Sequence, residues 1–123
     1  MNLEVQKKWV NALRSGEYKQ GREALKVKDT FCCLGVLCDL YSKEHNVGEW
    51  VQRDDFVDGF DYKEGDLPSA NGILPTHIML WAGLKEKNPV VSGSSRVRIE
   101  RLSRKNDAGT SFSKIADIIE KEI

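Results

Sequence analysis

Three cysteines lie within seven positions in the segment FCCLGVLCDLY, residues 31–41, and a thiol can bind zinc or act as a nucleophile. Structural zinc sites take cysteine pairs two to four residues apart, whereas Cys32 and Cys33 are adjacent. The pattern also lacks a second half, because the only histidines, His45 and His77, are isolated. The flanking Leu and Val residues provide an apolar setting, not the electropositive one that a reactive thiol needs. We therefore predict a buried helix with cysteines packed as small hydrophobes and no metal site.

The rest of the chain has no enzyme signature. The phosphate-binding GxxxxGK[ST] loop, the HExxH motif and a serine elbow are all missing. The carboxylates of RDDFVDGFDYKEGD, residues 53–66, do not follow the ligand spacing of an EF-hand and fit a solvated acidic loop. His77, next to Thr76 at an expected helix start, fits a surface or capping residue better than a general base. We expect a protein without catalytic residues or a cofactor.

Basic side chains gather in SSRVRIERLSRKND, residues 94–107, although 19 basic and 19 acidic residues give the chain a formal net charge of zero. The planar guanidinium of arginine makes paired hydrogen bonds to phosphate oxygens. Phosphate is therefore a candidate ligand, and a solvated strand and turn balanced by the acidic loop is the alternative. The candidate ligand-binding residues in this segment are Arg98, Arg101, Arg104, Asn106 and Asp107.

A second candidate surface is ALRSGEYKQ, residues 12–20, where Arg14, Tyr18 and Gln20 offer a charge, a ring and an amide. Nucleic-acid bases stack on aromatic faces with about 1–3 kcal/mol each. Tyr18 either takes this role or covers the edge of the core. Phe60, in a context of Gly and Asp, is either an anchor for its loop or an exposed stacking platform.

The elements that position these residues are predicted by periodicity. Helical spacing of apolar residues predicts helices over about 3–14, 31–45, 75–84 and 110–123. EWV and DFVDGFDY, residues 49–51 and 55–62, are either short strands or an excursion loop, and VRIE, residues 97–100, is predicted as a short strand. With 123 residues, 40% hydrophobic and 31% charged, we predict one α+β domain over residues 1–123. In it, N-terminal helices surround the buried cysteine-rich helix, with short antiparallel strands and a C-terminal helix.

Local signals refine the helix boundaries. Gly16 suits a left-handed end of the first helix, and Asp29 or Thr30 is placed to cap the second. Gly35 predicts close approach of another backbone, and Thr110 is placed to cap the last helix. In the strand at residues 97–100, alternation predicts that Ile99 faces the core.

The cellular compartment is predicted from the N-terminal segment, the longest apolar run and the arrangement of the cysteines. The N-terminus has helical periodicity and no signal-peptide stretch, and the longest apolar run, residues 31–40, is half of the roughly 20 residues needed to cross a bilayer. Clustered cysteines without distant partners suit a reducing compartment. We expect a cytoplasmic protein with no membrane partner.

Four blocks together resemble the phage Thoeris anti-defence family of signal-sequestering sponge proteins, across nearly the full chain. They are WVNALRSGEYKQG, FCCLGVLCDLY, LPTHIMLWAGL and NDAGTSFSKIADIIE. The resemblance implies a phage protein in the host cell cytoplasm that holds a cyclic ADP-ribose isomer, made by a bacterial TIR enzyme, without cleaving it. The host effector is then never activated. Some family members also take up cyclic oligonucleotides, and members assemble through dimers into larger homo-oligomers.

The resemblance also implies where the ligand binds, because in the family aromatic rings hold the base and arginines near a subunit interface hold the phosphates. The nearest matches here are Trp9 or Phe60 for stacking and Arg101 with Arg104 for the diphosphate. Periodicity alone places Trp9 in the core. The turn LSRKND carries extra basic residues, so which arginine holds phosphate stays open.

Two alternatives to sequestration remain at this point. The first is an enzyme that degrades the same signal with His77 or a loop carboxylate. The second is a module that binds nucleic acid or a protein through residues 96–105, although the neutral overall charge gives no general expectation of nucleic-acid binding. For sequestration, a small chain gains a closed pocket most readily between two subunits, so we expect at least a homodimer.

Overall fold

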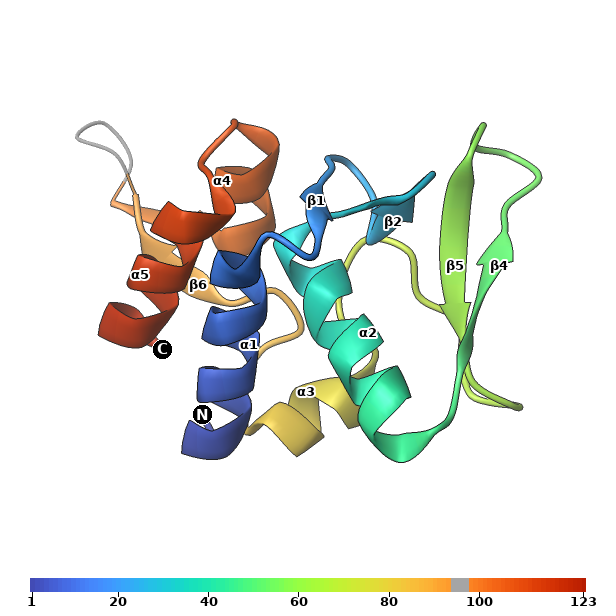
Figure 1. Cartoon of the computed structure of the whole chain (residues 1–123), viewed down its shortest axis with the longest axis horizontal. Helices are drawn as coiled ribbons and strands as arrows, with labels where there is room; N and C mark the ends of the chain where they lie inside the picture. Colours follow the sequence, from blue (N-terminus) through green and yellow to red (C-terminus); the bar gives the residue numbers. More distant parts are fainter. Residues whose placement is uncertain (94–97) are drawn as a thin grey trace.

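The computed structural model describes residues 1–93 and 98–123, and over these residues it contains five helices and two small sheets (Figure 1). This is an α+β fold, as predicted. None of the helices in the described part of the chain combines the length and the apolar character needed to cross a membrane.

Helix α1 (Leu3–Ser15) lies beside helix α5 (Phe112–Glu122), and this is the most extensive contact between two elements (Figure 1). The amide of Val5 donates to the side chain of Asn2, which caps α1. Gly16 ends α1 at a φ of 79°, as predicted for a left-handed glycine. Helix α5 is capped by Ser111 and not by Thr110, because the Ser111 hydroxyl accepts the free amide of Lys114.

Helix α2 (Cys33–His45) is the buried cysteine-rich helix. Its N-terminal cap is Cys32, whose sulfur accepts the amide of Gly35 at 3.4 Å. The prediction of Asp29 or Thr30 as the cap is wrong, because strand β3 (Thr30–Phe31) keeps the backbone extended through Phe31 and delays the helix.

Gly35 is a point of close backbone approach, as predicted. A Cβ at this position would lie 1.9 Å from the carbonyl oxygen of Leu25, which is itself fully buried. Helix α2 therefore sits directly against the chain that leads into strand β2 (Lys26–Val27). The C-terminal helix α5 packs mainly on α1.

The larger sheet has the strand order β1-β3-β2-β5-β4, with β1 (Lys19–Gln20) parallel to β3 and the other pairs antiparallel. Strands β4 (Glu49–Gln52) and β5 (Gly59–Lys63) match two of the predicted strands in position. The second begins four residues later than predicted, because Asp58 takes a left-handed turn conformation with a φ of 62°.

The C-terminal half begins with helix α3 (Thr76–Ala82), which Gly83 ends at a φ of 70°. A two-stranded sheet of β6 (Val90–Ser92) and β7 (Ile99–Arg101) leads directly into helix α4 (Leu102–Asp107). Part of the strand predicted at 97–100, with Val97, lies outside the described residues, as does Arg96.

The orientation predicted for Ile99 is wrong, because its side chain is 66% exposed. The shielded side chain of β7 is Glu100, which Lys105 contacts at 3.4 Å from the last turn of α4. Helix α4 was not predicted. It is only six residues long, and the two side chains that it buries completely are Leu102 and the polar Asn106.

Candidate functional site

Lys26 lies among three aromatic rings on the larger sheet. Its ammonium nitrogen is 4.7 Å from the ring centroid of Phe60, 5.3 Å from that of Phe31 and 5.9 Å from that of Trp50. All four side chains are partly exposed. We call Lys26, Phe31, Trp50 and Phe60 the lysine–aromatic cluster.

Strand register produces this cluster. Lys26 of β2 stands opposite Phe31 of β3 on one side and opposite Phe60 of β5 on the other. Residues directly opposite in a ladder project to the same face of the sheet. Trp50 joins them from β4, where it stands opposite the fully buried Tyr62. The cluster therefore packs against the hydrophobic core at this side.

The rings fix one another in place. Phe31 lies edge-on to Tyr18, with centroids 5.2 Å apart, and edge-on to Trp50 at 5.7 Å. Trp50 in turn lies edge-on to Tyr62 at 5.3 Å. Such edge-to-face pairs are favourable arrangements of aromatic quadrupoles. The sheet therefore presents a set of rings whose orientations are already set.

The carboxylate of Asp39, from α2, anchors two of these rings. It accepts hydrogen bonds from the hydroxyl of Tyr18 at 2.6 Å, from the indole of Trp50 at 3.2 Å and from the ammonium of Lys43 at 2.9 Å. Burial opposes ionisation of Asp39, but these three donors outweigh it and hold its pKa below the usual value. Burial and the bond to Asp39 raise the pKa of Tyr18 to about 12.

Lys26 differs from the other lysine at this face. Lys43 is paired with Asp39, whereas none of the ion pairs found within residues 1–93 and 98–123 involves Lys26. An ammonium held against ring faces keeps a favourable contact without an anion, since each cation–π contact contributes about 0.5–1 kcal/mol at an exposed site. Lys26 can therefore accept an anionic group from outside the chain while the rings accept a planar one.

The arginines of the basic segment lie on the surface. The guanidinium of Arg101 contacts Glu86 at 2.9 Å and donates to the carbonyl of Asn88 at 3.0 Å. The Arg104 side chain is 81% exposed and lies 3.8 Å from Glu100. Arg98 is exposed as well. The Arg101–Glu86 pair is exposed to solvent, and the Arg104–Glu100 contact is long. The guanidinium groups can therefore bind either water or a phosphate.

Gln20 and Asn106 are structural links and not ligand contacts. The Gln20 amide donates to the Asn106 side chain at 3.0 Å and to the Thr110 carbonyl at 2.7 Å. Asn106 is fully buried, accepts the amide of Cys33 at 3.2 Å and donates to the carbonyl of Gly21 at 2.8 Å. The Gln20 oxygen also accepts a backbone amide. The nitrogen and the oxygen of both side-chain amides are thus hydrogen-bonded inside the fold.

Three further predicted site residues are also engaged within the chain. Trp9 has no exposed surface and donates its indole hydrogen to the Cys33 carbonyl at 2.9 Å, so it is a core residue and not a stacking platform. Arg14 joins α1 to α5 through carboxylates at 2.5 and 2.6 Å. Asp107 accepts the backbone amide of Glu23 at 3.0 Å. Of the predicted aromatic candidates, Phe60 and Tyr18 remain at the surface.

The cysteines are buried, as predicted. Burial raises the pKa of the Cys32 thiol to about 11 and raises those of Cys33 and Cys38 well above the usual value. These thiols are therefore protonated and shielded near neutral pH. Within residues 1–93 and 98–123, no group of three His, Cys, Asp or Glu side chains is placed to hold a metal ion.

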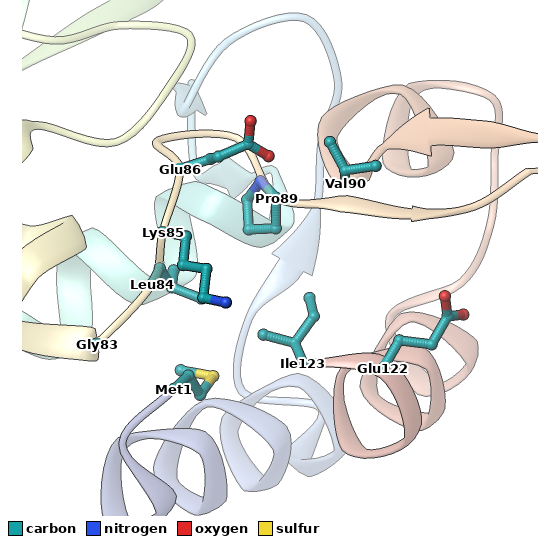
Figure 2. A pocket seen from close by; sticks show the side chains of 9 residues that line it. All are labelled: Met1, Gly83, Leu84, Lys85, Glu86, Pro89, Val90, Glu122 and Ile123. Atoms are coloured by element: carbon teal, nitrogen blue, oxygen red, sulfur yellow. The ribbon is translucent and has the colours of Figure 1, made fainter.

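A pocket of about 300 Å³ lies between the start of the chain, the segment after α3 and the end of α5 (Figure 2). Its charged side chains are Lys85, Glu86 and Glu122. Two carboxylates against one ammonium make it a poor site for a phosphorylated ligand. Arg101 is not one of its lining residues, but it pairs with two of them, through an ion pair with Glu86 and opposite Val90 in the β6–β7 ladder.

The rings and the arginines are not brought together within one chain. In Figure 1, β4 and β5 lie at one end of the molecule's long axis, whereas β6 and α4 lie towards the other. The sequence suggested Phe60 and Arg101 separately, but it did not indicate Lys26, Phe31 or Trp50. The short hairpin KVKDTF sets Lys26 opposite Phe31 and could have indicated that pair, but Trp50 is placed only by the pairing of β4 with β5.

Comparison with known proteins gives a family and no relative of described activity. No curated protein and no solved structure matches the chain significantly. The model of a family described as a domain of unknown function, DUF8296, matches residues 1–123, and the chain therefore belongs to this family.

Proposed function

We propose that this protein binds a cyclic ADP-ribose-type signal, holds it without cleaving it, and so blocks activation of the bacterial Thoeris effector in the host cytoplasm. The observation that carries the proposal is the lysine–aromatic cluster, in which the ammonium of Lys26 lies 4.7 Å from the ring centroid of Phe60. It pairs a lysine charge, which no ion pair among the described residues uses, with preset rings, and a phosphorylated base requires these two groups. The resemblance of four sequence blocks to the sponge family supports the same ligand class.

The expected contacts follow from the chemistry of each group. A base stacked on a partly exposed ring gains about 1–3 kcal/mol. A charge-assisted hydrogen bond from Lys26 to a phosphate oxygen adds about 1.5–3 kcal/mol. Because the rings are already oriented by their neighbours, little conformational freedom is lost when the ligand binds.

The same geometry favours holding the ligand over reacting with it. Asp39, the carboxylate that accepts the Trp50 indole, has three donors and stays ionised, so it is poorly placed to take or give a proton. Lys26 supplies charge, and the rings supply contact area. A protein that sequesters a signal needs tight stoichiometric binding, which these groups provide without an acid–base pair.

The separation of the rings from the arginines bears on assembly. Strand β5, which carries Phe60, lies at one end of the long axis, whereas α4 and β6, the strand that pairs with the β7 of Arg101, lie towards the other (Figure 1). A nucleotide that contacts both groups is therefore best accommodated between two copies of the chain. We therefore include a homodimer or larger homo-oligomer in the proposal. The double variant Arg101→Ala with Arg104→Ala should then weaken nucleotide binding while the protein stays folded and assembled.

Calorimetric titration with a panel of cyclic ADP-ribose isomers and cyclic oligonucleotides tests the proposal. We expect saturable binding of at least one cyclic ADP-ribose isomer. The complex is then heated, and the released nucleotide is weighed by mass spectrometry and tested for its ability to activate the effector. An unchanged, active nucleotide supports sequestration. No binding by any cyclic ADP-ribose isomer would exclude the proposed ligand class.

One observation favours a degrading enzyme as the second candidate, namely the direct contact between the imidazole Nε2 of His77 and the carboxylate of Glu64. Such a pair can act as an oriented general base. Recovery of an altered nucleotide, lost in His77→Gln, would establish this alternative. The exposed arginines of residues 98–104 keep nucleic-acid or protein binding as a further outcome, which steep salt dependence on generic DNA would reveal.

A further inference from the structure

A second pocket, of about 370 Å³, lies between the segment that follows β5 and the first turns of α3. Ligand pockets in proteins span about 300–1,000 Å³ and are mostly apolar with a few polar groups. This pocket is separate from the lysine–aromatic cluster, since the two share no lining residue.

The walls of this pocket are apolar and fixed. Leu67 and Leu80, which are 45% and 65% exposed, both contribute to them. Ala70, on the same wall, exchanges backbone hydrogen bonds with Tyr62 of β5 at 2.7 and 3.0 Å. The wall is thereby tied to the core, so the pocket is present before any ligand arrives. Exposed leucines that line a preformed hollow favour an apolar occupant.

The polar groups of the pocket give it a positive character. Its charged lining residue is Lys87, and the remaining polar lining residues are Ser69, Thr76 and His77. No carboxylate belongs to the lining. Among the ion pairs found in the described residues, none involves Lys87.

The orientation of the His77 imidazole is set by Glu64 and Tyr41. Its Nε2 contacts Glu64, which also accepts the hydroxyl of the buried Tyr62 at 3.5 Å. The ring of Tyr41 packs edge-on against the imidazole at 5.4 Å. Glu64 is thus engaged with His77 and Tyr62, and the charge offered to the pocket is that of Lys87.

We propose that this second pocket binds a small organic anion with an apolar body, whose acidic group pairs with Lys87 and whose body packs between Leu67 and Leu80. The complementarity of charge and the apolar walls carry the inference. It does not depend on the proposed sequestration, because neither the lysine–aromatic cluster nor Arg101 and Arg104 line this pocket; His77, the base of the alternative enzyme, does.

The test uses two fluorescent probes that differ in charge. 8-Anilinonaphthalene-1-sulfonate carries a sulfonate, and N-phenyl-1-naphthylamine is its neutral counterpart. We expect the sulfonate probe to bind the folded protein with a stoichiometry near one, more tightly than the neutral probe. Added NaCl should weaken binding of the sulfonate probe alone, because only its charge is screened.

Variants locate the binding. Lys87→Gln should lower the affinity for the sulfonate probe about two- to fivefold, as expected when a partly exposed charge pair is lost. The affinity for the neutral probe should not change. Leu80→Asp should lower the affinity for both probes. Lys85→Gln is the matched control, because Lys85 lines the pocket of Figure 2 and not this one. If the sulfonate probe binds Lys87→Gln as it binds the wild type, the proposal is wrong.

Nucleotide titration separates this inference from the proposed function. Lys87→Gln should bind a cyclic ADP-ribose isomer as the wild type does, whereas Lys26→Gln should bind the sulfonate probe as the wild type does. Loss of both ligands in both variants would show a shared site and would overturn the second pocket. Circular dichroism of each variant establishes that it is folded.

Discussion

Lys26 and Phe60 face each other across the β2–β5 ladder, with the ammonium 4.7 Å from the ring centroid. Replacing either partner should reduce nucleotide binding. Phe60→Ala removes one stacking surface and should weaken affinity about fivefold to a hundredfold, which corresponds to 1–3 kcal/mol. Lys26→Gln should weaken affinity about tenfold or more, because a charge-assisted hydrogen bond is lost. Isothermal titration calorimetry measures both.

The matched control for Lys26 is Lys28→Gln. Lys28 is two residues away and exposed, and its ammonium lies 3.8 Å from Asp58. Its replacement should leave nucleotide affinity unchanged. Equal losses in Lys26→Gln and Lys28→Gln would mean that general surface charge, and not the cluster, attracts the ligand.

The pKa of Asp39 predicts a pH-dependent stability. Because its folded-state pKa is below the unfolded value of about 3.9, the carboxylate stabilises the fold above about pH 4. This contribution is lost as the pH falls through the folded-state pKa. Asp39→Asn should be less stable at pH 7 by about 1–3 kcal/mol, and its stability should fall less steeply at acid pH. Urea unfolding between pH 3 and pH 7 measures this difference, with the exposed Asp54→Asn as the control that changes little.

Asn106 is predicted to matter for folding and not for ligand binding. Asn106→Leu would leave the Cys33 amide and the Gly21 carbonyl without their side-chain partner, at a cost of about 2–4 kcal/mol. Thermal unfolding measures the loss, and Asn11→Ala, on the exposed side of α1, serves as the neutral comparison. A fully stable Asn106→Leu that has lost nucleotide binding would restore Asn106 to the ligand site.

Gly35 has a direct steric test. A methyl group there would overlap the Leu25 carbonyl, so Gly35→Ala should destabilise the fold by at least about 2 kcal/mol. Gly72→Ala is the natural control, because a Cβ at Gly72 meets nothing within 4 Å. Equal stability of the two variants, measured by urea unfolding, would contradict the close approach of α2 to the chain before β2.

The three cysteines should react only when the fold opens. Their raised pKa values and burial predict slow alkylation by iodoacetamide in buffer at pH 8 and fast alkylation of all three in urea. Mass spectrometry counts the labelled thiols. A rapidly labelled thiol in the native protein, or zinc at one equivalent in purified protein, would contradict the packing role.

Sequence periodicity predicted the longer helices because each buries several apolar side chains on one face, as α1 does with Val5, Trp9 and Leu13. Periodicity failed where the buried side chain is polar or where the element is only a few residues long. Helix α4 buries Asn106 where periodicity requires an apolar residue, and Ile99 is exposed on a two-stranded sheet. Two-residue strands such as β2 carry no alternation to detect.

The candidate site shows the same limit. Phe60 was indicated by its Gly- and Asp-rich context, and the arginines were indicated by local charge. Lys26 becomes informative only once the register of four strands, β2 to β5, is known, because its ring partners come from positions 31, 50 and 60. Gln20 and Asn106 look like ligand contacts in sequence, since nothing in a sequence tells whether an amide is already satisfied inside the fold.

The separation along the long axis of β4 and β5 from β6 and α4 constrains the number of binding sites in any assembly whose ligand contacts both the rings and the arginines (Figure 1). A two-fold dimer must then align its chains antiparallel along their length, so that each end of one chain meets the other end of its neighbour, giving two equivalent sites. A head-to-tail arrangement gives as many sites as chains only if it closes into a ring. In both closed forms the binding capacity equals the number of chains, whereas an open row always leaves one set of rings and one set of arginines unused.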